Sequence, residues 1–231
     1  MGFIDDIKED QKMQIQALCV AFFLLAFPSY FFLKAAATDD PAGMGGLGFY
    51  EVTGEISYID FDNGGEYIAS GETLTIPLNT DALGSEDQGK NIVGVLVTLS
   101  YDEDEQSQGA PCFSQTSPDT ISVTATHLEF TNSQDGQNGE ATGHSVTTEW
   151  YNSSLVGEIV IMEEADIISE LDSNGAGLGD YTIDISVQAQ ADSCATVVTG
   201  SNEDNGEDVS YNIQLIVLDY DIVPWIDLSD L

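Results

Sequence analysis

The chain has 231 residues with 41 acidic side chains, four lysines, no arginine and two histidines, which gives a formal net charge of −37 at pH 7. Hydrophobic residues make up 42% of the sequence, enough for a sizeable core, and the length suits one domain or one domain with an appendage. Nucleic acid and anionic membrane surfaces are excluded as partners, because binding them requires clusters of Lys or Arg. Catalysis that depends on arginine clamps or on a lysine-bearing phosphate loop is excluded for the same reason.

An uncharged run of 21 residues, 13–33, dominates the N-terminal part of the chain. A helix of this length spans about 30 Å, the thickness of the hydrocarbon core of a bilayer. Lys8 and Lys12 precede the run and Lys34 follows it, a bias that favours a cytoplasmic N-terminus. The pattern predicts a cytoplasmic stub over 1–12, a single transmembrane helix over 13–33, and a protein of the cell membrane whose remaining residues are exported.

A cleaved signal peptide is the alternative interpretation of the same run. Ala35-Ala36-Ala37 is a small-residue pattern at the place where a signal peptidase would cut. The leading segment is net acidic and the run is longer than a usual signal core, which favours an uncleaved anchor. Either interpretation exports the domain over 49–231, which follows a Gly-rich linker over 34–48.

The domain switches to a period-two alternation of apolar and polar side chains, which predicts strands. Asn63-Gly64-Gly65 and Asp135-Gly136 are typical turn signals, and one segment, 163–172, has the pattern of a helix. Strands without intervening helices predict an all-β, antiparallel β-sandwich. The expected strands cover 51–60, 72–79, 91–101, 120–130, 145–151, 155–162, 181–190 and 209–220.

The segment 172–187 reads DSNGAGLGDYTIDISV: a glycine turn after a short helix, then a Tyr two residues ahead of a buried strand position. It resembles the tyrosine corner of immunoglobulin-like and polycystic-kidney-disease-type (PKD-like) sandwiches. The resemblance implies that the Tyr181 hydroxyl closes the corner and that Ile183, Ile185 and Val187 face inward. It also implies that the last strand, 209–220, pairs with the strand that carries them. The cysteine pair of immunoglobulin domains is missing.

Cys112 and Cys194 are the two cysteines outside the apolar run, which contains Cys19. In an oxidising compartment two cysteines allow one connectivity, so we expect a disulfide between them. The bridge would close a loop of 83 residues and stabilise the fold by roughly 4–5 kcal/mol in the chain-entropy model. A metal site is the alternative, but two cysteines without a nearby histidine are a poor ligand set.

His127 and His144 are the two histidines, and neither has the close spacing to Cys112 or Cys194 that blue copper requires. The sequence has no G-x-S-x-G motif and no α/β pattern that could carry a catalytic triad. Pairs of carboxylates arise by chance among 41 acids, so they do not indicate glycoside hydrolysis. We therefore expect no catalytic residue and no enzymatic activity.

The segment 60–66, DFDNGGE, begins like a calcium loop, with alternating oxygen ligands followed by glycine. The Glu expected at position 12 of such a loop is absent, and Gly71 stands there. Two interpretations stay open: a calcium site with Asp60, Asp62 and Glu66 as ligands, or a solvated hairpin turn. Calcium is the one candidate cofactor.

Asn152-Ser153-Ser154 forms an N-glycosylation sequon in a region where a turn is expected. Such sequons occur often by chance. Glycosylation of Asn152 and an unmodified turn are therefore both open interpretations.

Of the 41 acids, 37 lie after Lys34, where Lys90 is the one base. This composition is typical of a salty medium, in which a Debye length of about 4–5 Å screens repulsion between carboxylates. Together the features predict a membrane-anchored, surface-exposed sandwich with a structural or protein-interaction role, in the cell envelope or as an accessory subunit of a membrane complex. Its expected partners are the membrane and another envelope or membrane protein. A cation- or ligand-binding module for transport or adhesion is the alternative, and an anchored enzyme comes third.

Overall fold

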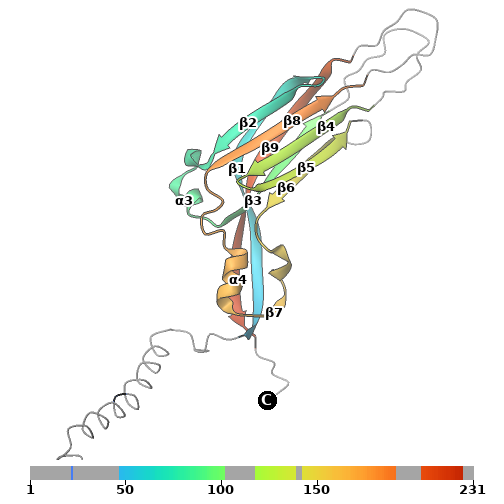
Figure 1. The fold of residues 1–231 in the computed structure, drawn as a ribbon. Coiled ribbons are helices and arrows are strands. Elements are labelled where there is room, and N and C mark those ends of the chain that lie inside the picture. The colour runs from blue at the N-terminus through green and yellow to red at the C-terminus, as the bar shows by residue number, and fades with distance from the viewer. Residues whose placement is uncertain (1–21, 23–46, 102–117, 139–141, 191–203, 226–231) are drawn as a thin grey trace, which may run out of the picture. The chain divides into compact units, whose positions relative to one another are not determined.

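A computed structural model describes residues 22, 47–101, 118–138, 142–190 and 204–225. The chain divides into two units, Met1–Leu47 and Gly48–Leu231. Strands and short helices build the described part of the second unit (Figure 1). Its elements are β1 (Gly48–Ala69), β2 (Thr73–Asn79), η1 (Thr80–Ala82), α3 (Ser85–Gln88), β3 (Ile92–Tyr101), β4 (Thr120–His127), β5 (Phe130–Gln137), β6 (Gly143–Glu149), η2 (Ser153–Leu155), β7 (Ile159–Met162), α4 (Glu164–Leu171), β8 (Asp180–Gln188) and β9 (Gly206–Pro224).

The strands form two antiparallel sheets that pack face to face (Figure 1). A five-stranded sheet has the order β6-β3-β9-β1-β7, and a four-stranded sheet has the order β2-β8-β4-β5. The first and last strands, β1 and β9, pair along almost their whole length, from Tyr50 opposite Pro224 to Ala69 opposite Gly206. The prediction of an all-β, antiparallel sandwich is therefore confirmed.

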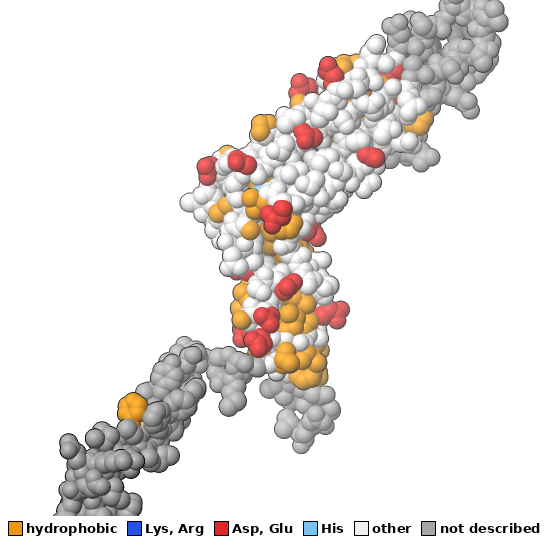
Figure 2. Space-filling view, in the orientation of Figure 1, with side chains coloured by type: hydrophobic (Ala, Val, Ile, Leu, Met, Phe, Trp, Pro, Cys, Tyr) orange, Lys and Arg blue, Asp and Glu red, His pale blue; other side chains and the backbone are white. Residues whose placement is uncertain are grey.

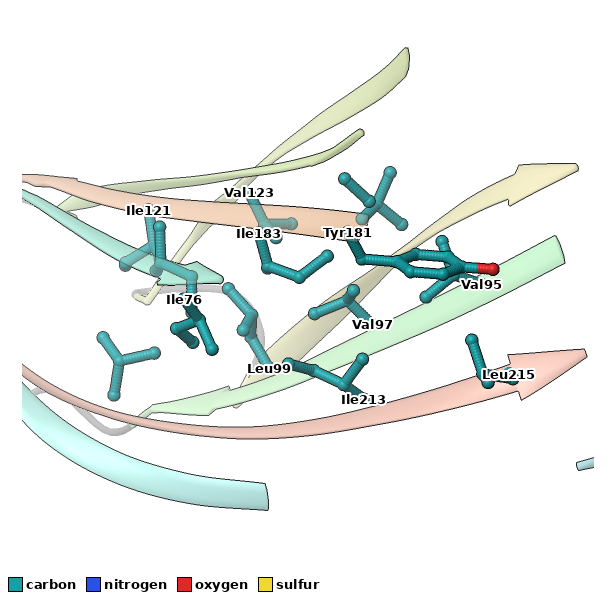
Figure 3. Close-up of a cluster of buried hydrophobic side chains, with 14 of the residues drawn as sticks. Ile76, Val95, Val97, Leu99, Ile121, Val123, Tyr181, Ile183, Ile213 and Leu215 are labelled. Atoms are coloured by element: carbon teal, nitrogen blue, oxygen red, sulfur yellow. The ribbon is translucent and has the colours of Figure 1, made fainter. Parts of the chain in front are cut away.

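The main core fills the space between the two sheets and is almost entirely aliphatic (Figure 3). Alternation along each strand supplies it: every second residue of β4 and β8 is buried, and the residues between them are partly exposed. Ile183, Ile185 and Val187 are all fully buried, so the inward face expected for this strand is confirmed. Removing such side chains from water contributes about 1.5–3 kcal/mol each.

A second, smaller core lies on the opposite face of the five-stranded sheet, where α4 packs against it. Strand β9 serves both cores, because Leu215 and Val217 point into the main core while Ile216 and Leu218 point into the second. Burial on both faces explains why this strand contains an unbroken apolar run instead of an alternation. The helix predicted over 163–172 is confirmed as α4.

Three sequence-based expectations about strand layout are wrong. The last strand does not pair with the strand that carries Ile183: β9 lies between β1 and β3, whereas β8 lies between β2 and β4. The turn signals Asn63-Gly64-Gly65 and Asp135-Gly136 lie inside β1 and β5. Strand β5 itself was not expected, because its sequence FTNSQDGQ is polar and belongs to an exposed edge strand with no alternation to detect.

The N-terminal expectations fall mostly on residues that are not described. Of the uncharged run 13–33, the structure describes Phe22 alone, as an exposed helical residue. Among the described residues there is no helix with the length and apolar character required to cross a bilayer. The transmembrane helix over 13–33 therefore stays a prediction.

Candidate functional site

The three acids expected to bind calcium lie in strand β1 and do not converge. A β-bulge places the extra residue Phe61 between them, so Asp60 pairs with Gln214 and Asp62 with Ile213. Because adjacent residues of a strand point to opposite faces, Asp60 lies on the face of the sheet opposite to Asp62. The Asp60 carboxylate accepts a hydrogen bond from Gln214 Nε2 at 2.8 Å. The described residues contain no group of three or more His, Cys, Asp or Glu side chains placed to hold a metal ion.

Asp62 and Glu66 instead flank a tyrosine of the neighbouring strand. Tyr211 pairs with Gly64, and its phenol lies over that glycine, so that a Cβ at position 64 would be 2.5 Å from Tyr211 Oη. Burial, together with the negative charges of Asp62 and Glu66, raises the pKa of Tyr211 above its ordinary value of 10.0. A side chain larger than that of glycine at position 64 would collide with the Tyr211 ring. The predicted turn does not form there, because residues 62–69 continue to pair with β9.

A buried polar cluster lies where β4 begins, β5 ends and β9 begins. Asp119 and Glu207 are both fully buried, and the Asn138 side chain joins them. Its Oδ1 accepts a hydrogen bond from the Asp119 backbone at 2.7 Å, and its Nδ2 donates to Glu207 Oε1 at 2.8 Å. Asp119 Oδ1 accepts from the backbone of Gln190 at 2.7 Å, but Asp119 Oδ2 has no hydrogen-bond partner among the described residues.

Within the part of the chain that the structure describes, no lysine or arginine pairs with the Asp119 carboxylate. After Lys34 the chain contains one lysine and no arginine, and that lysine, Lys90, pairs with Asp87 at 2.7 Å. A buried carboxylate is costly unless a positive charge or a proton compensates it. Sequence analysis missed Asp119 and Glu207 because nothing in a chain with 41 acids distinguishes a buried acid from a solvated one.

His127 belongs to a stack of aromatic rings at the other end of β4. It is 1% exposed and lies flat on the Tyr181 ring, with 4.0 Å between the ring centroids and 12° between the planes. Trp150 packs against the same imidazole at 4.8 Å. The ring nitrogens contact two carbonyl oxygens, Nδ1 to Asp180 at 2.9 Å and Nε2 to Ala176 at 2.6 Å. A carbonyl oxygen only accepts, so a neutral ring donates one of these hydrogen bonds and a doubly protonated ring donates both.

The Tyr181 side chain also binds the loop that precedes β8. Its hydroxyl donates to the carbonyl oxygen of Gly177 at 2.7 Å, the hydroxyl-to-backbone contact that defines a tyrosine corner. Burial raises the pKa of Tyr181 well above its ordinary value. Thr80 holds the same loop, since its hydroxyl accepts from the backbone of Gly179 at 2.8 Å.

His144 is also engaged in internal contacts. Its Nε2 lies 3.2 Å from the carbonyl oxygen of Gln134 and must donate to it, which leaves Nδ1 to accept from the Tyr101 hydroxyl at 2.8 Å. Burial lowers the pKa of His144 below 6.5, and this favours the neutral ring that such an arrangement requires. Each ring nitrogen of the two histidines thus lies within hydrogen-bonding distance of a group inside the sandwich.

The remaining predicted sites, a glycosylated Asn152 and a disulfide, stay predictions. Asn152 caps η2: its Oδ1 accepts from Ser154 Oγ at 2.6 Å, while its Nδ2 donates to Glu170 at 3.1 Å. The nitrogen that a glycan would modify therefore has a hydrogen-bond partner, and glycosylation stays a prediction. Cys112 and Cys194 lie outside the described residues, and so does the expected disulfide.

Exposed apolar side chains gather at the end of the domain where β1 begins and β9 ends (Figure 2). They come from three adjacent strands of the five-stranded sheet. We call them the terminal apolar patch and define it as Phe49, Ile159, Ile161 and Val223.

Comparisons with known proteins identify no family. No family model and no curated protein matches the chain. Among solved structures, the carbohydrate-binding module TmCBM61 in complex with beta-1,4-galactotriose is 8% identical with a TM-score of 0.27, and the match covers 74% of this chain and 88% of that one. A marine algae virus of the order Picornavirales gives 10% identity and a TM-score of 0.23, over 82% and 76% of the two chains. Likeness at this level bears neither on fold family nor on ligand.

Proposed function

We propose that this chain is a membrane-anchored, surface-exposed acidic sandwich with a structural or protein-interaction role. The observation that carries the proposal is the order of parts along the chain, an uncharged run of 21 residues followed by an acidic β-sandwich. A helix over 13–33 would hold the membrane, and the domain from Gly48 onward would stand outside the cell. The partner would be another protein of the envelope or of a membrane complex.

Two internal features support a structural role. Both histidines use their ring nitrogens in contacts within the sandwich, and the Tyr181 hydroxyl fastens a loop to the core. The tyrosine corner also supports an immunoglobulin-like or PKD-like relationship, in which the sandwich is a scaffold for surfaces at its ends.

Protease treatment of intact cells that express the full chain tests the anchored topology. We expect loss of the sandwich and retention of a membrane-embedded stump that resists carbonate extraction. A mature N-terminus at Thr38 would overturn the uncleaved anchor, and full protection of the sandwich would overturn its exposure.

A second candidate function, cation binding, is favoured by the buried Asp119 carboxylate. Its Oδ2, which has no hydrogen-bond partner among the described residues, is an oxygen ligand of the kind that calcium prefers. Calcium at low millimolar concentration should therefore raise the melting temperature even in molar NaCl. Asp119→Asn should remove that increment, while Asp60→Asn, on the exposed strand, should keep it. A wild-type melting temperature indifferent to calcium would overturn this candidate.

A further inference from the structure

The terminal apolar patch occupies two neighbouring rows on one face of the five-stranded sheet. Phe49 pairs with Ile161 in the first row, and Glu51 pairs with Ile159 on one side and with Val223 on the other in the second. Directly opposed residues share a face, as do residues two apart in a strand, so the four apolar side chains point the same way. Their exposed fractions are 52% for Phe49, 57% for Ile161, 48% for Ile159 and 52% for Val223.

No described element covers this face. The four-stranded sheet packs on the same side of β1 only from Ile59 onward, and α4 covers the opposite side, where Tyr50 and Val52 are buried. Apolar side chains that gather on a surface normally mark a place where something else binds. In Figure 2 hydrophobic side chains gather at this end of the domain, with acidic side chains beside them and along the rest of its length.

The chain itself indicates what covers the patch. Leu47, 75% exposed, leads into β1, so the patch begins where the polypeptide arrives from the uncharged run 13–33. The intervening residues 34–46 span at most about 45 Å when fully extended. A membrane held by the uncharged run is therefore within reach of this end of the domain.

Aromatic residues beside the patch suit a lipid interface. Trp225 directly follows β9, donates its backbone N–H to the Phe49 carbonyl oxygen at 2.9 Å and packs its ring 6.1 Å from the Phe49 ring. Trp is enriched where one end of the ring meets hydrocarbon and the other meets water.

A second copy of the chain fits the patch less well. Glu51 lies in the middle of the second row, between Ile159 and Val223. A two-fold contact through this face would bring two Glu51 carboxylates together in a desolvated interface, in a chain with a net charge of −37. In a lipid headgroup region the same carboxylate keeps its water.

We infer that the terminal apolar patch rests in the headgroup region of the membrane that holds residues 13–33, and so fixes the orientation of the sandwich. This inference rests on the proposed membrane anchor and adds a second, independent contact with lipid. The acidic surface selects zwitterionic over anionic headgroups.

The test uses the full chain reconstituted in phosphatidylcholine vesicles, with and without lipids brominated on the acyl chains. Flotation on a density gradient reports the anchor, and quenching of Trp225 emission by the bromines reports contact of the patch. We expect flotation, with quenching that disappears in Trp225→Phe because the remaining Trp150 lies partly buried against the main core, where its Nε1 donates to the Ile92 carbonyl oxygen at 3.0 Å. The double change Ile161→Ser and Val223→Ser should reduce quenching and keep flotation. Leu128→Ser, an equally exposed apolar site in the β4–β5 turn, should change neither.

The possible results separate the two proposals. Flotation without quenching of Trp225 overturns the lipid contact and leaves the anchor intact. Absence of flotation overturns both. A detergent-solubilised dimer that the double change at Ile161 and Val223 converts to a monomer would show that the patch binds a second copy, and would also overturn the lipid contact.

Discussion

His127 joins strand β4 to Ala176 and Asp180, which lie 49 and 53 residues farther along the chain, through their carbonyl oxygens, and it stacks on the Tyr181 ring. A smaller side chain would leave a cavity and two buried carbonyl oxygens without these contacts. We expect His127→Ala to lower the free energy of unfolding by about 2–4 kcal/mol. Denaturant unfolding measures the change, and Thr126→Ala, on the exposed face of the same strand, should change stability by less than about 1 kcal/mol. Equal losses in the free energy of unfolding for His127→Ala and Thr126→Ala would show that the contacts of His127 do not stabilise the fold.

His144 makes stability depend on pH. Its pKa in the folded protein is lowered by burial, so the unfolded chain binds the proton more readily. The free energy that the neutral His144 contributes to folding is therefore fully present above pH 6.5, the ordinary pKa of the unfolded histidine. It is lost as the pH falls through the lower pKa of the folded protein.

In molar NaCl, which screens the carboxylates, the wild-type chain should lose stability relative to His144→Gln between pH 7.5 and 5. Chemical unfolding at several pH values measures this difference. Parallel stability curves for the two proteins would show that the His144 proton is not linked to folding.

At the scale of elements, the loop between α4 and β8 is pressed against strand β3. Gly177 lies so close to Ile92 that a Cβ at position 177 would collide with the carbonyl oxygen and the Cβ of Ile92. Backbone cannot move aside without disturbing β3, so Gly177→Ala should destabilise the fold by about 1–3 kcal/mol.

Gly84→Ala is the matched control for this prediction. Position 84 has open space around its Cβ and a φ of −64°, so the change should leave stability the same or raise it by about 0.4–1 kcal/mol. Thermal unfolding of both variants separates the steric effect from the general effect of replacing glycine. A neutral Gly177→Ala would mean that the loop is not packed as described.

The pairing of β1 with β9 decides how the elements assemble. These strands lie at the two ends of the sequence of the sandwich, yet they pair over 19 positions. Such non-local pairing requires a long loop to close before any contact forms, a feature of β-sandwiches that fold in milliseconds to seconds.

For the whole molecule, repulsion among acids is the main opposing electrostatic term. The described part of the chain contains a single salt bridge, Lys90 to Asp87, against a net charge of −37 for the full sequence. Screening must relieve this repulsion, so the melting temperature should rise substantially from millimolar to molar NaCl. KCl should act like NaCl, because screening depends on ionic strength. A melting temperature that stays flat across this range would show that the acid excess is not an adaptation to salt.

Sequence alone determined the strands and the helix that have a clear periodicity. Alternation predicted strands at β4 and β8, and the resemblance of the segment 172–187 to a tyrosine corner predicted the inward face of β8 and the bond of the Tyr181 hydroxyl to the backbone. These features are local, because side-chain period and turn chemistry act over a few residues. Strand β5 has no such period and was missed.

Only the tertiary structure decided which strands pair and which acids meet. Gly64 looks like a turn residue but makes room for Tyr211, which comes from a strand more than a hundred residues away in the sequence. The bulge at Phe61 separates Asp60 from Asp62, and the meeting of three strand ends buries Asp119 with Glu207. Register, bulges and burial depend on contacts between distant segments, and a single strand's sequence does not contain them.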